Sequence, residues 1–223
     1  MERYSRFLSL NDINKDDLLS LSQKRVLIVG VGGVGQHVAT YLLTNGVINL
    51  TIVDFDKVEL SNLNRQFLVT EDDVGKDKVD VVKTALLKRN SEGKITSLNL
   101  KVTDDNADEL VNGYDLLIDA VDNWESKLVL AKVTNKSHIP FLHVGVAGYK
   151  GQCCLFKNKS LLDVVDDEIL NAPKDGVLGP MVGLVASYAS LLAIRFLLNK
   201  KIETDVIHYL DFNDNRLVNI EIK

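Results

Sequence analysis

Cysteine and proline are scarce in this chain of 223 residues, which contains two cysteines and three prolines. The cysteines, Cys153 and Cys154, are adjacent, and neighbouring side chains in a strand point to opposite faces, so they are poor disulfide partners. Nor can two cysteines form a structural zinc site with four cysteine ligands. The sequence therefore predicts a fold without disulfide or zinc crosslinks, in a reducing, cytoplasmic setting.

The chain also lacks an excess of positive charge, since its formal net charge is −5. A mildly acidic chain is not expected to coat nucleic acid or to bind a membrane through basic residues. Residues 1–24 contain no apolar stretch typical of a signal peptide. Residues 181–198 are apolar enough to approach a membrane-spanning length. Because this segment follows Gly179-Pro180 and precedes strand-like segments, we interpret it as a helix buried in an α/β domain.

The remaining composition is that of a globular domain, with 46% hydrophobic and 26% charged residues. A chain of this length can bury about 70% of its unfolded surface, so it needs no crosslink to fold. We expect a single domain over residues 1–223 that begins with an arm or helix at residues 1–24.

Short apolar runs alternate with segments of helical periodicity. Strands are expected at residues 25–30, 50–54, 95–102, 114–120, 140–146 and 152–156, and helices at residues 33–45, 75–88 and 124–135. This alternation predicts an α/β fold, a doubly wound, Rossmann-like, mostly parallel sheet with helices on both faces. Residues 206–211 and 217–222 are expected to add an antiparallel C-terminal extension. We interpret residues 157–176 as a mobile loop or short helix that crosses over a site.

A glycine-rich loop, GVGGVG at residues 30–35, joins the first strand to the first helix. Gly30 permits a tight turn, Gly32 lets the backbone approach a phosphate, and Gly35 lets the helix pack on the strand. The N-terminus of the helix then presents free N–H groups to an anion. Asp54 ends the second strand and is placed to accept hydrogen bonds from a ribose. These features predict a nucleotide site without naming the nucleotide.

Cations follow the second strand, in SNLNRQ at residues 61–66 and VGKDKV at residues 74–79. Arg65 and one or two lysines, Lys78 among them, are thereby placed beside a phosphate tail. Hydride transfer does not need such cations, whereas attack on an α-phosphate does, because charge develops on the phosphoryl oxygens and the departing pyrophosphate. The alternative is that they are ordinary solvated surface cations.

Two carboxylates close the fourth strand, in DAVDN at residues 119–123. Either Asp119 or Asp122 is a candidate ligand of Mg²⁺, and Asp122 reaches further into the crevice. The alternative is that Asp122 or Asn123 caps the helix that follows.

These motifs, together with RYSR at residues 3–6 and DFD at residues 54–56, occur in one order along nearly the whole chain. In that order they resemble the ThiF/MoeB/HesA adenylyltransferase family, whose relatives include the ubiquitin-activating enzymes. The resemblance implies a homodimer that binds ATP and Mg²⁺ and activates a carboxylate as an acyl-adenylate.

The resemblance also implies roles for individual residues. Arg65, Lys78 and Asp122 are implied to be catalytic, with Asp122 orienting Mg²⁺, and Arg6 matches an arginine that the family supplies from the partner subunit. The implied nucleotide-binding set is Gly30, Gly32, Gly33, Gly35, Asp54, Asp56, Ser61, Asn62, Arg65, Lys78, Asp122 and Asn123.

Two features depart from the family pattern. Many relatives carry two CxxC pairs that bind zinc, and this sequence has neither, so no zinc is expected. Relatives that capture the substrate covalently use a cysteine where this sequence reads NAPKDG, at residues 171–176. We therefore expect adenylation without a covalent enzyme intermediate.

The resemblance leaves the substrate open. We favour the C-terminal glycine of a ubiquitin-fold sulfur carrier protein, whose tail would pass beneath residues 157–176, with release of pyrophosphate. The alternative is a small-molecule or short-peptide carboxylate, in cofactor or natural-product biosynthesis. An NAD-dependent oxidoreductase would explain the glycine loop but not Arg65, Lys78 and Asp122, and a non-catalytic binding module is a further alternative. Among the histidines, only His143 is a candidate for contacting substrate.

Overall fold

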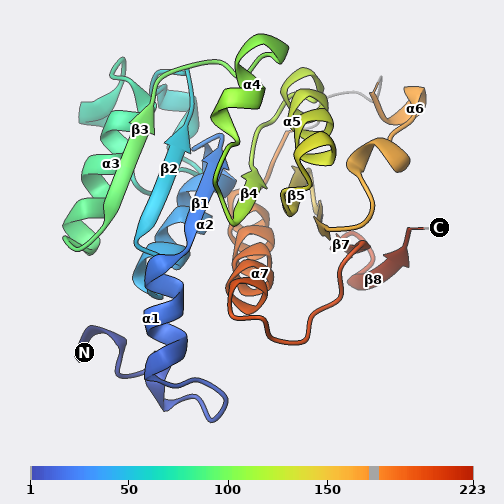
Figure 1. Ribbon diagram of the computed structural model, residues 1–223. Helices are drawn as coiled ribbons and strands as arrows, with labels where there is room; N and C mark the ends of the chain where they lie inside the picture. Colours follow the sequence, from blue (N-terminus) through green and yellow to red (C-terminus); the bar gives the residue numbers. More distant parts are fainter. Residues whose placement is uncertain (1, 171–175, 223) are drawn as a thin grey trace.

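The computed structural model describes residues 2–170 and 176–222. One eight-stranded sheet takes in the named strands of these residues, in the order β3-β2-β1-β4-β5-β6-β7-β8 (Figure 1). The first five strands pair in parallel, and the last three join them antiparallel. Their bounds are β1 Arg25–Val29, β2 Asn49–Val53, β3 Lys94–Leu98, β4 Leu116–Asp119, β5 Phe141–Ala147, β6 Lys150–Phe156, β7 Val206–Asp211 and β8 Arg216–Glu221.

Helices cover both faces of the sheet. The α-helices are α1 Lys15–Gln23, α2 Gly33–Thr44, α3 Lys78–Arg89, α4 Asp104–Leu110, α5 Trp124–Ser137, α6 Asp167–Leu170 and α7 Gly179–Leu197. Short 3-10 turns occur at Glu2–Tyr4, Phe7–Ser9, Leu60–Asn62, Glu71–Asp73 and Leu161–Asp163. One face packs against α2, α3 and α7, and the other against α4 and α5, so each face has its own hydrophobic core. The predicted doubly wound fold is confirmed.

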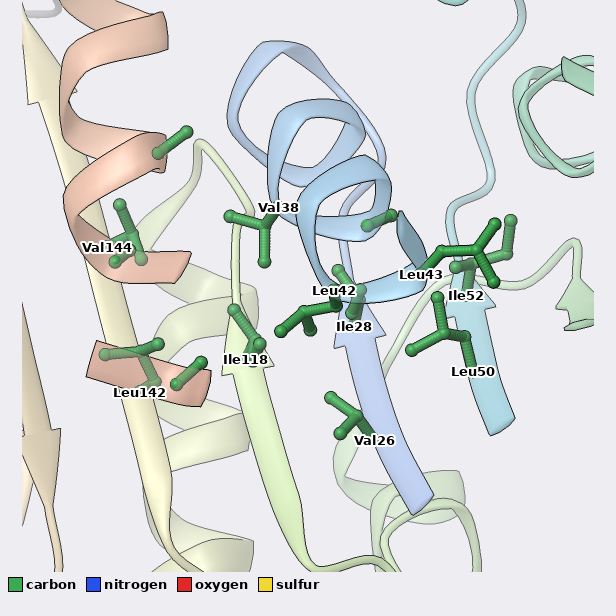
Figure 2. Close-up of a cluster of buried hydrophobic side chains, with 14 of the residues drawn as sticks. Val26, Ile28, Val38, Leu42, Leu43, Leu50, Ile52, Ile118, Leu142 and Val144 are labelled. Atoms are coloured by element: carbon green, nitrogen blue, oxygen red, sulfur yellow. The ribbon is translucent and has the colours of Figure 1, made fainter. Parts of the chain in front are cut away.

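Alternation along the strands produces these two cores, because successive side chains of a strand point to opposite faces. In β1, Val26 and Ile28 face α2, whereas Leu27 and Val29 face the α5 side. Figure 2 shows Val38, Leu42 and Leu43 of α2 lying over the first of these sets. Full burial of one such side chain contributes roughly 1.5–3 kcal/mol.

The adjacent cysteines follow the same alternation. Cys153 belongs to the core beneath α7 and Cys154 to the core beneath α5, and both thiols are free. The prediction that they point to opposite faces is confirmed. Burial raises the pKa of the Cys153 thiol to about 12, so this sulfur is not a nucleophile at neutral pH.

Helix α7 is the only helix of the described residues that is long and apolar enough to cross a membrane. Half of its most apolar window is buried within the protein, and its buried residues pack against β5, β6 and α2. This arrangement agrees with the interpretation of residues 181–198 as a core helix.

Three segments differ from, or complete, the sequence predictions. Helix α4 was not expected, because only Ala107 of its seven residues is buried and the segment has little apolar periodicity. Its start is fixed instead by Thr103 and Asn106, which cap each other's backbone N–H groups. Strand β3 is shorter than the predicted segment 95–102. Of residues 157–176, the described part contains Leu161–Asp163 and α6, and residues 171–175 lie outside the described residues.

Candidate active site

The site lies where the order of strands reverses. From β1 the chain proceeds outward through β2 and β3, and it then returns to build β4 and β5 on the other side of β1. The carboxyl ends of β1 and β4 therefore border a crevice, the usual ligand position in such sheets. Gly30 N donates to Val53 O at 2.7 Å and Ala120 N donates to Val29 O at 2.8 Å, so the segments that leave three strands meet at this point.

Packing requires glycine at two positions of the loop. Gly30 has a φ of +87°, and a Cβ there would lie 2.6 Å from Ala120 O. A Cβ on Gly35 would lie 1.9 Å from Gly30 O, so α2 can start this close to β1 only with glycine. At Gly32 the nearest atom to an added Cβ is Gln66 Nε2 at 3.7 Å, and the backbone is open to a ligand. The geometric reasons inferred for Gly30 and Gly35 are confirmed, whereas the approach of a phosphate to Gly32 stays a prediction.

The N-terminus of α2 offers unpaired donors to an anion. Its N-cap residue is Gly32, which provides no side-chain cap, and no acidic residue occupies the first turn. Free N–H groups and the positive end of the helix dipole favour a phosphate at this position.

Asp54 is held between the glycine loop and a buried lysine. Its Oδ2 accepts a hydrogen bond from Val31 N at 2.8 Å, and its Oδ1 accepts one from Asp56 N at 2.9 Å. Lys78, the first residue of α3, places Nζ 3.1 Å from Asp56 Oδ2 and 3.9 Å from Asp54 Oδ1. Burial raises the pKa of Asp54 above its ordinary value, against the opposing charge of Lys78.

Lys78 is only 4% exposed, so it is not the solvated surface cation of the alternative interpretation. Lys76, two residues earlier, does fit that description, because it pairs with Asp73 at 2.8 Å on the surface. An ammonium group carries three N–H donors, so Lys78 can hold its carboxylates and still donate to a phosphate oxygen.

Arg65 lies beside the glycine loop, because a Cβ on Gly33 would lie 3.2 Å from Arg65 Cγ. Its Nη1 donates to Ser61 O at 3.0 Å and to Asn64 Oδ1 at 2.9 Å, and the side chain is half-buried. Asn62 is buried, and its Oδ1 accepts from Glu59 N. The turn at residues 60–65 thus fixes the arginine, whose second terminal nitrogen and Nε carry further donors.

A pair of glutamines that the sequence interpretation did not assign joins this turn to the loop. Gln36 of α2 is 1% exposed, and its Nε2 donates to Val31 O and to Gln66 Oε1, both at 3.1 Å. Its Oε1 accepts from Leu68 N at 2.9 Å. These bonds hold the loop and the Arg65 segment in one fixed arrangement. The spacing of Gln36 and Gln66 along the chain gave no signal of this contact.

The two carboxylates after β4 have different environments. Asp122 is exposed, and the described residues provide it with no ion pair. It therefore fits a Mg²⁺ ligand that acts together with phosphate oxygens. Asn123 Oδ1 accepts from Ser126 N at 2.9 Å and caps α5, so the capping alternative holds for Asn123. Its amide N–H groups remain available to a ligand.

Asp119 is fully buried, and both of its oxygens are bonded within the protein, so it is a poorer candidate for Mg²⁺ than Asp122. Lys127 Nζ lies 3.2 and 3.0 Å from its two oxygens, and His143 Nδ1 lies 2.7 Å from Oδ2. Burial acts to raise the pKa of Asp119, but Lys127 and His143 outweigh it and hold this pKa below its ordinary value. Burial, and then Lys127, lower the pKa of His143, so its imidazole is neutral.

Arg6 is the one predicted site residue that lies far from the others within the chain. Its neighbour Tyr4 accepts a hydrogen bond from Asn90, the C-cap of α3, whereas Lys78 begins that helix. A helix of this length spans about 18 Å. Figure 1 shows the N-terminal segment at the edge of the molecule away from the carboxyl ends of β1 and β2.

Together these residues place a buried carboxylate, two cations and an exposed carboxylate around the uncapped N-terminus of α2. Such a fold and arrangement are typical of the class of α/β proteins that bind nucleotides and act on phosphates. The chain belongs to the ThiF family, because the model of that family matches residues 4–222.

Relatives with similar sequences are named as adenylyltransferases. The molybdopterin-synthase adenylyltransferase of Haemophilus influenzae is 32% identical over 200 residues, covering 86% of this chain and 82% of that protein. The adenylyltransferase and sulfurtransferase MOCS3 of Aedes aegypti is 33% identical over 208 residues, or 88% of this chain. The chain spans only 47% of that longer relative.

Solved structures share the fold. The crystal structure of Escherichia coli MccB with AMPCPP and MccA has a TM-score of 0.87 at 24% sequence identity, covering 99% of this chain and 71% of that one. The structure of PaaA has a TM-score of 0.84 at 24% identity, covering 99% of this chain and 73% of that one.

Proposed function

We propose that the chain is an ATP-dependent adenylyltransferase that converts a carboxylate into an acyl-adenylate and releases pyrophosphate. The observation that carries this proposal is the buried Lys78 beside Asp54 and Asp56, at the mouth of the uncapped α2 N-terminus. Hydride transfer does not need a buried cation at the position of a phosphate, so this lysine argues against an NAD-dependent oxidoreductase. The names of the relatives, which are adenylyltransferases, support the proposed activity.

In the proposed reaction a carboxylate oxygen of the substrate attacks the α-phosphorus of ATP, and the bond between the α-phosphorus and the bridging oxygen breaks. A carboxylate is already ionised at neutral pH, so no general base is required. Arg65, Lys78 and the N–H groups of α2 bind the phosphates and neutralise charge that develops on them. Asp122 would hold Mg²⁺, which adds positive charge beside the same oxygens.

For the substrate we propose the C-terminal glycine of a ubiquitin-fold sulfur carrier protein. The name of the Haemophilus influenzae relative, a molybdopterin-synthase adenylyltransferase, supports this choice, since it names a protein as the acceptor of the adenylyl group. A short-peptide or small-molecule carboxylate is the alternative substrate. Either acid would be activated within a single domain and without zinc.

We further propose a homodimer in which Arg6 acts on the site of the partner subunit. Within one chain, the segment that carries Arg6 is bonded to the C-terminal end of α3, through Arg3 and Tyr4. Arg6 would therefore need a second copy to approach a phosphate. The outer surface of α2 and α7 exposes Tyr41, Leu184 and Leu191, which a second copy would cover.

Two measurements test the proposal. Binding of ATP and of NAD, each with Mg²⁺, is measured by calorimetry, and acyl-adenylates are sought by mass spectrometry after the protein is mixed with ATP and cell extract. We expect ATP binding and an adenylate in the wild type, and loss of the adenylate in Lys78→Met and Arg65→Ala. Lys76→Met is the matched control, because Lys76 lies two residues from Lys78 with its ammonium on the surface. Binding of NAD but not ATP would refute the proposal.

A further inference from the structure

A small cavity that the proposed chemistry does not use lies next to the site, on the face of the sheet that carries α5. It has a volume of about 60 Å³. The half-buried Trp124 at the start of α5 contributes to its lining, most of which is apolar. His143 of β5 and Gln152 of β6 supply its polar groups, and Val164, Val165 and Ile169 supply much of the apolar wall.

The cavity is close to the proposed position of the reacting carboxylate. Trp124 follows Asp122 by two residues, and two residues span at most about 7 Å of chain. One or two residues of an extended peptide bridge the same distance. A substrate whose carboxylate sits beside Asp122 therefore brings the side chain of its last or next-to-last residue to the mouth of the cavity.

The polar side chains that line the cavity are held by hydrogen bonds, and they carry no net charge together with the ion pair behind them. His143 Nδ1 donates to the ionised Asp119, so Nε2 is an acceptor, and Gln152 Nε2 approaches it at 3.3 Å. The ring of His143 is stacked against Trp124, with centroids 6.4 Å apart. The positive charge of Lys127 balances the negative charge of Asp119, so this ion pair has no net charge. None of the described residues that line the cavity is charged, so a charged group would be desolvated there without a partner among them.

Size sets a second limit on the occupant. A buried water requires roughly 10–15 Å³ of such volume, so the cavity has room for about four to six atoms of that size. This volume suits a compact aliphatic or hydroxyl side chain, and it is too small for an aromatic ring with its linking methylene.

We propose that this cavity is a specificity pocket for the side chain of the last or next-to-last residue of the substrate acid, and that this side chain is compact and uncharged. The inference rests on the proposed adenylation. It adds the substrate class, a peptide or protein tail that carries such a side chain. In a tail that ends in glycine this is the side chain of the next-to-last residue, and the last residue can supply it only in the alternative short-peptide acid. Trp124, His143 and Gln152 then determine specificity, and Asp119 with Lys127 positions the imidazole.

The pocket can be tested directly, because Trp124 is the only tryptophan of the chain. Its fluorescence is followed while triglycine, Gly-Val-Gly, Gly-Gly-Val, Gly-Phe-Gly, Gly-Asp-Gly and Gly-Lys-Gly are titrated, with and without a non-hydrolysable ATP analogue. We expect one of the two valine peptides to bind at least about tenfold more tightly than triglycine, since a buried valine side chain accounts for such a factor. The phenylalanine, aspartate and lysine peptides are expected to gain nothing.

Val165→Phe fills the cavity and should remove the preference for valine. Leu162→Phe is the matched control, because Leu162 lies in the same segment but is 37% exposed and outside the cavity wall. The control should keep the wild-type preference, and the melting temperatures of both variants verify that they fold.

The outcomes separate the two proposals. Equal binding of triglycine and both valine peptides by the wild type would overturn the specificity pocket, whether or not the variants fold. Tight binding of the aspartate, lysine or phenylalanine peptide would overturn it too, as would a valine preference that survives in Val165→Phe. Failure to bind ATP, by contrast, would overturn the proposed adenylation, while the peptide series would still decide what the pocket accepts.

Discussion

Replacing Lys127 by methionine removes the buried counter-ion of Asp119 and keeps most of the apolar stem. The Lys127 side chain is 8% exposed and that of Asp119 is fully buried, so water does not replace the lost ammonium. Breaking a buried ion pair from one side costs about 3–5 kcal/mol of unfolding free energy. Val144 O also loses its donor, which Lys127 provides at 3.1 Å. We expect a loss in this range at about pH 8.

The size of this loss should depend on pH through His143. In the wild type, burial and Lys127 lower the pKa of His143, so the unfolded state takes up the proton first and stability falls as the pH drops through about 6.5. In Lys127→Met the imidazole is left to balance Asp119, and we expect its pKa to rise relative to the wild type because the opposing charge of Lys127 is gone. The variant should therefore lose less stability than the wild type as the pH falls through about 6.5. The difference from wild type should shrink at about pH 5.5.

Urea unfolding at these two pH values, followed by Trp124 fluorescence and circular dichroism, measures both effects. Lys132→Met is the matched control on the same helix, because Lys132 pairs with Asp104 at 3.8 Å with both side chains exposed. It should cost less than about 1 kcal/mol. The double variant Lys127→Met with Asp119→Asn should lose less than Lys127→Met alone. A cost below about 1 kcal/mol for Lys127→Met, or one that does not change with pH, would refute the reasoning.

Three further predictions concern the loop, the thiols and the dimer. Gly35→Ala should lower the melting temperature and abolish ATP binding, because its Cβ would overlap Gly30 O. Gly32→Ala should fold normally and lose only ATP affinity, because its Cβ has room. Equal melting temperatures for the two variants would contradict this prediction. Iodoacetamide at about pH 8 should modify neither Cys153 nor Cys154 before urea is added, since burial raises the pKa of both thiols, and mass spectrometry would reveal any early reaction. Mixing Arg6→Ala with Asp122→Ala protein should restore part of the adenylate formation through hybrid dimers, and absence of rescue despite subunit exchange would argue against a trans role for Arg6.

The sheet and its glycine loop were predictable because local patterns determine them. A short apolar run rich in β-branched residues, such as residues 25–30, favours a strand buried on both faces. The glycines at residues 30 and 35 are required by contacts with nearby backbone. The position of Asp54 follows from the same logic, since it ends the neighbouring parallel strand. These features depend on residues close in sequence or on strands that must be adjacent.

The environments of the charged groups were not predictable. Lys78 is an ordinary lysine in the sequence, and its burial depends on two carboxylates more than twenty residues earlier. The sequence favoured Asp122 over Asp119 as the residue that reaches the crevice, but it gave no sign that Lys127 and His143 would bond to Asp119. The choice between capping and binding at Asn123 likewise required the position of Ser126 N. Each of these outcomes depends on contacts between separate elements, which no local periodicity encodes.

Asp54 accepts a hydrogen bond from Val31 N, so contacts within the chain itself hold the shape of the loop. The conformational entropy of this turn is therefore lost when the chain folds and not when a nucleotide binds. An incoming nucleotide meets a rigid receptor, and each contact it makes there adds to affinity without a penalty for closing the turn.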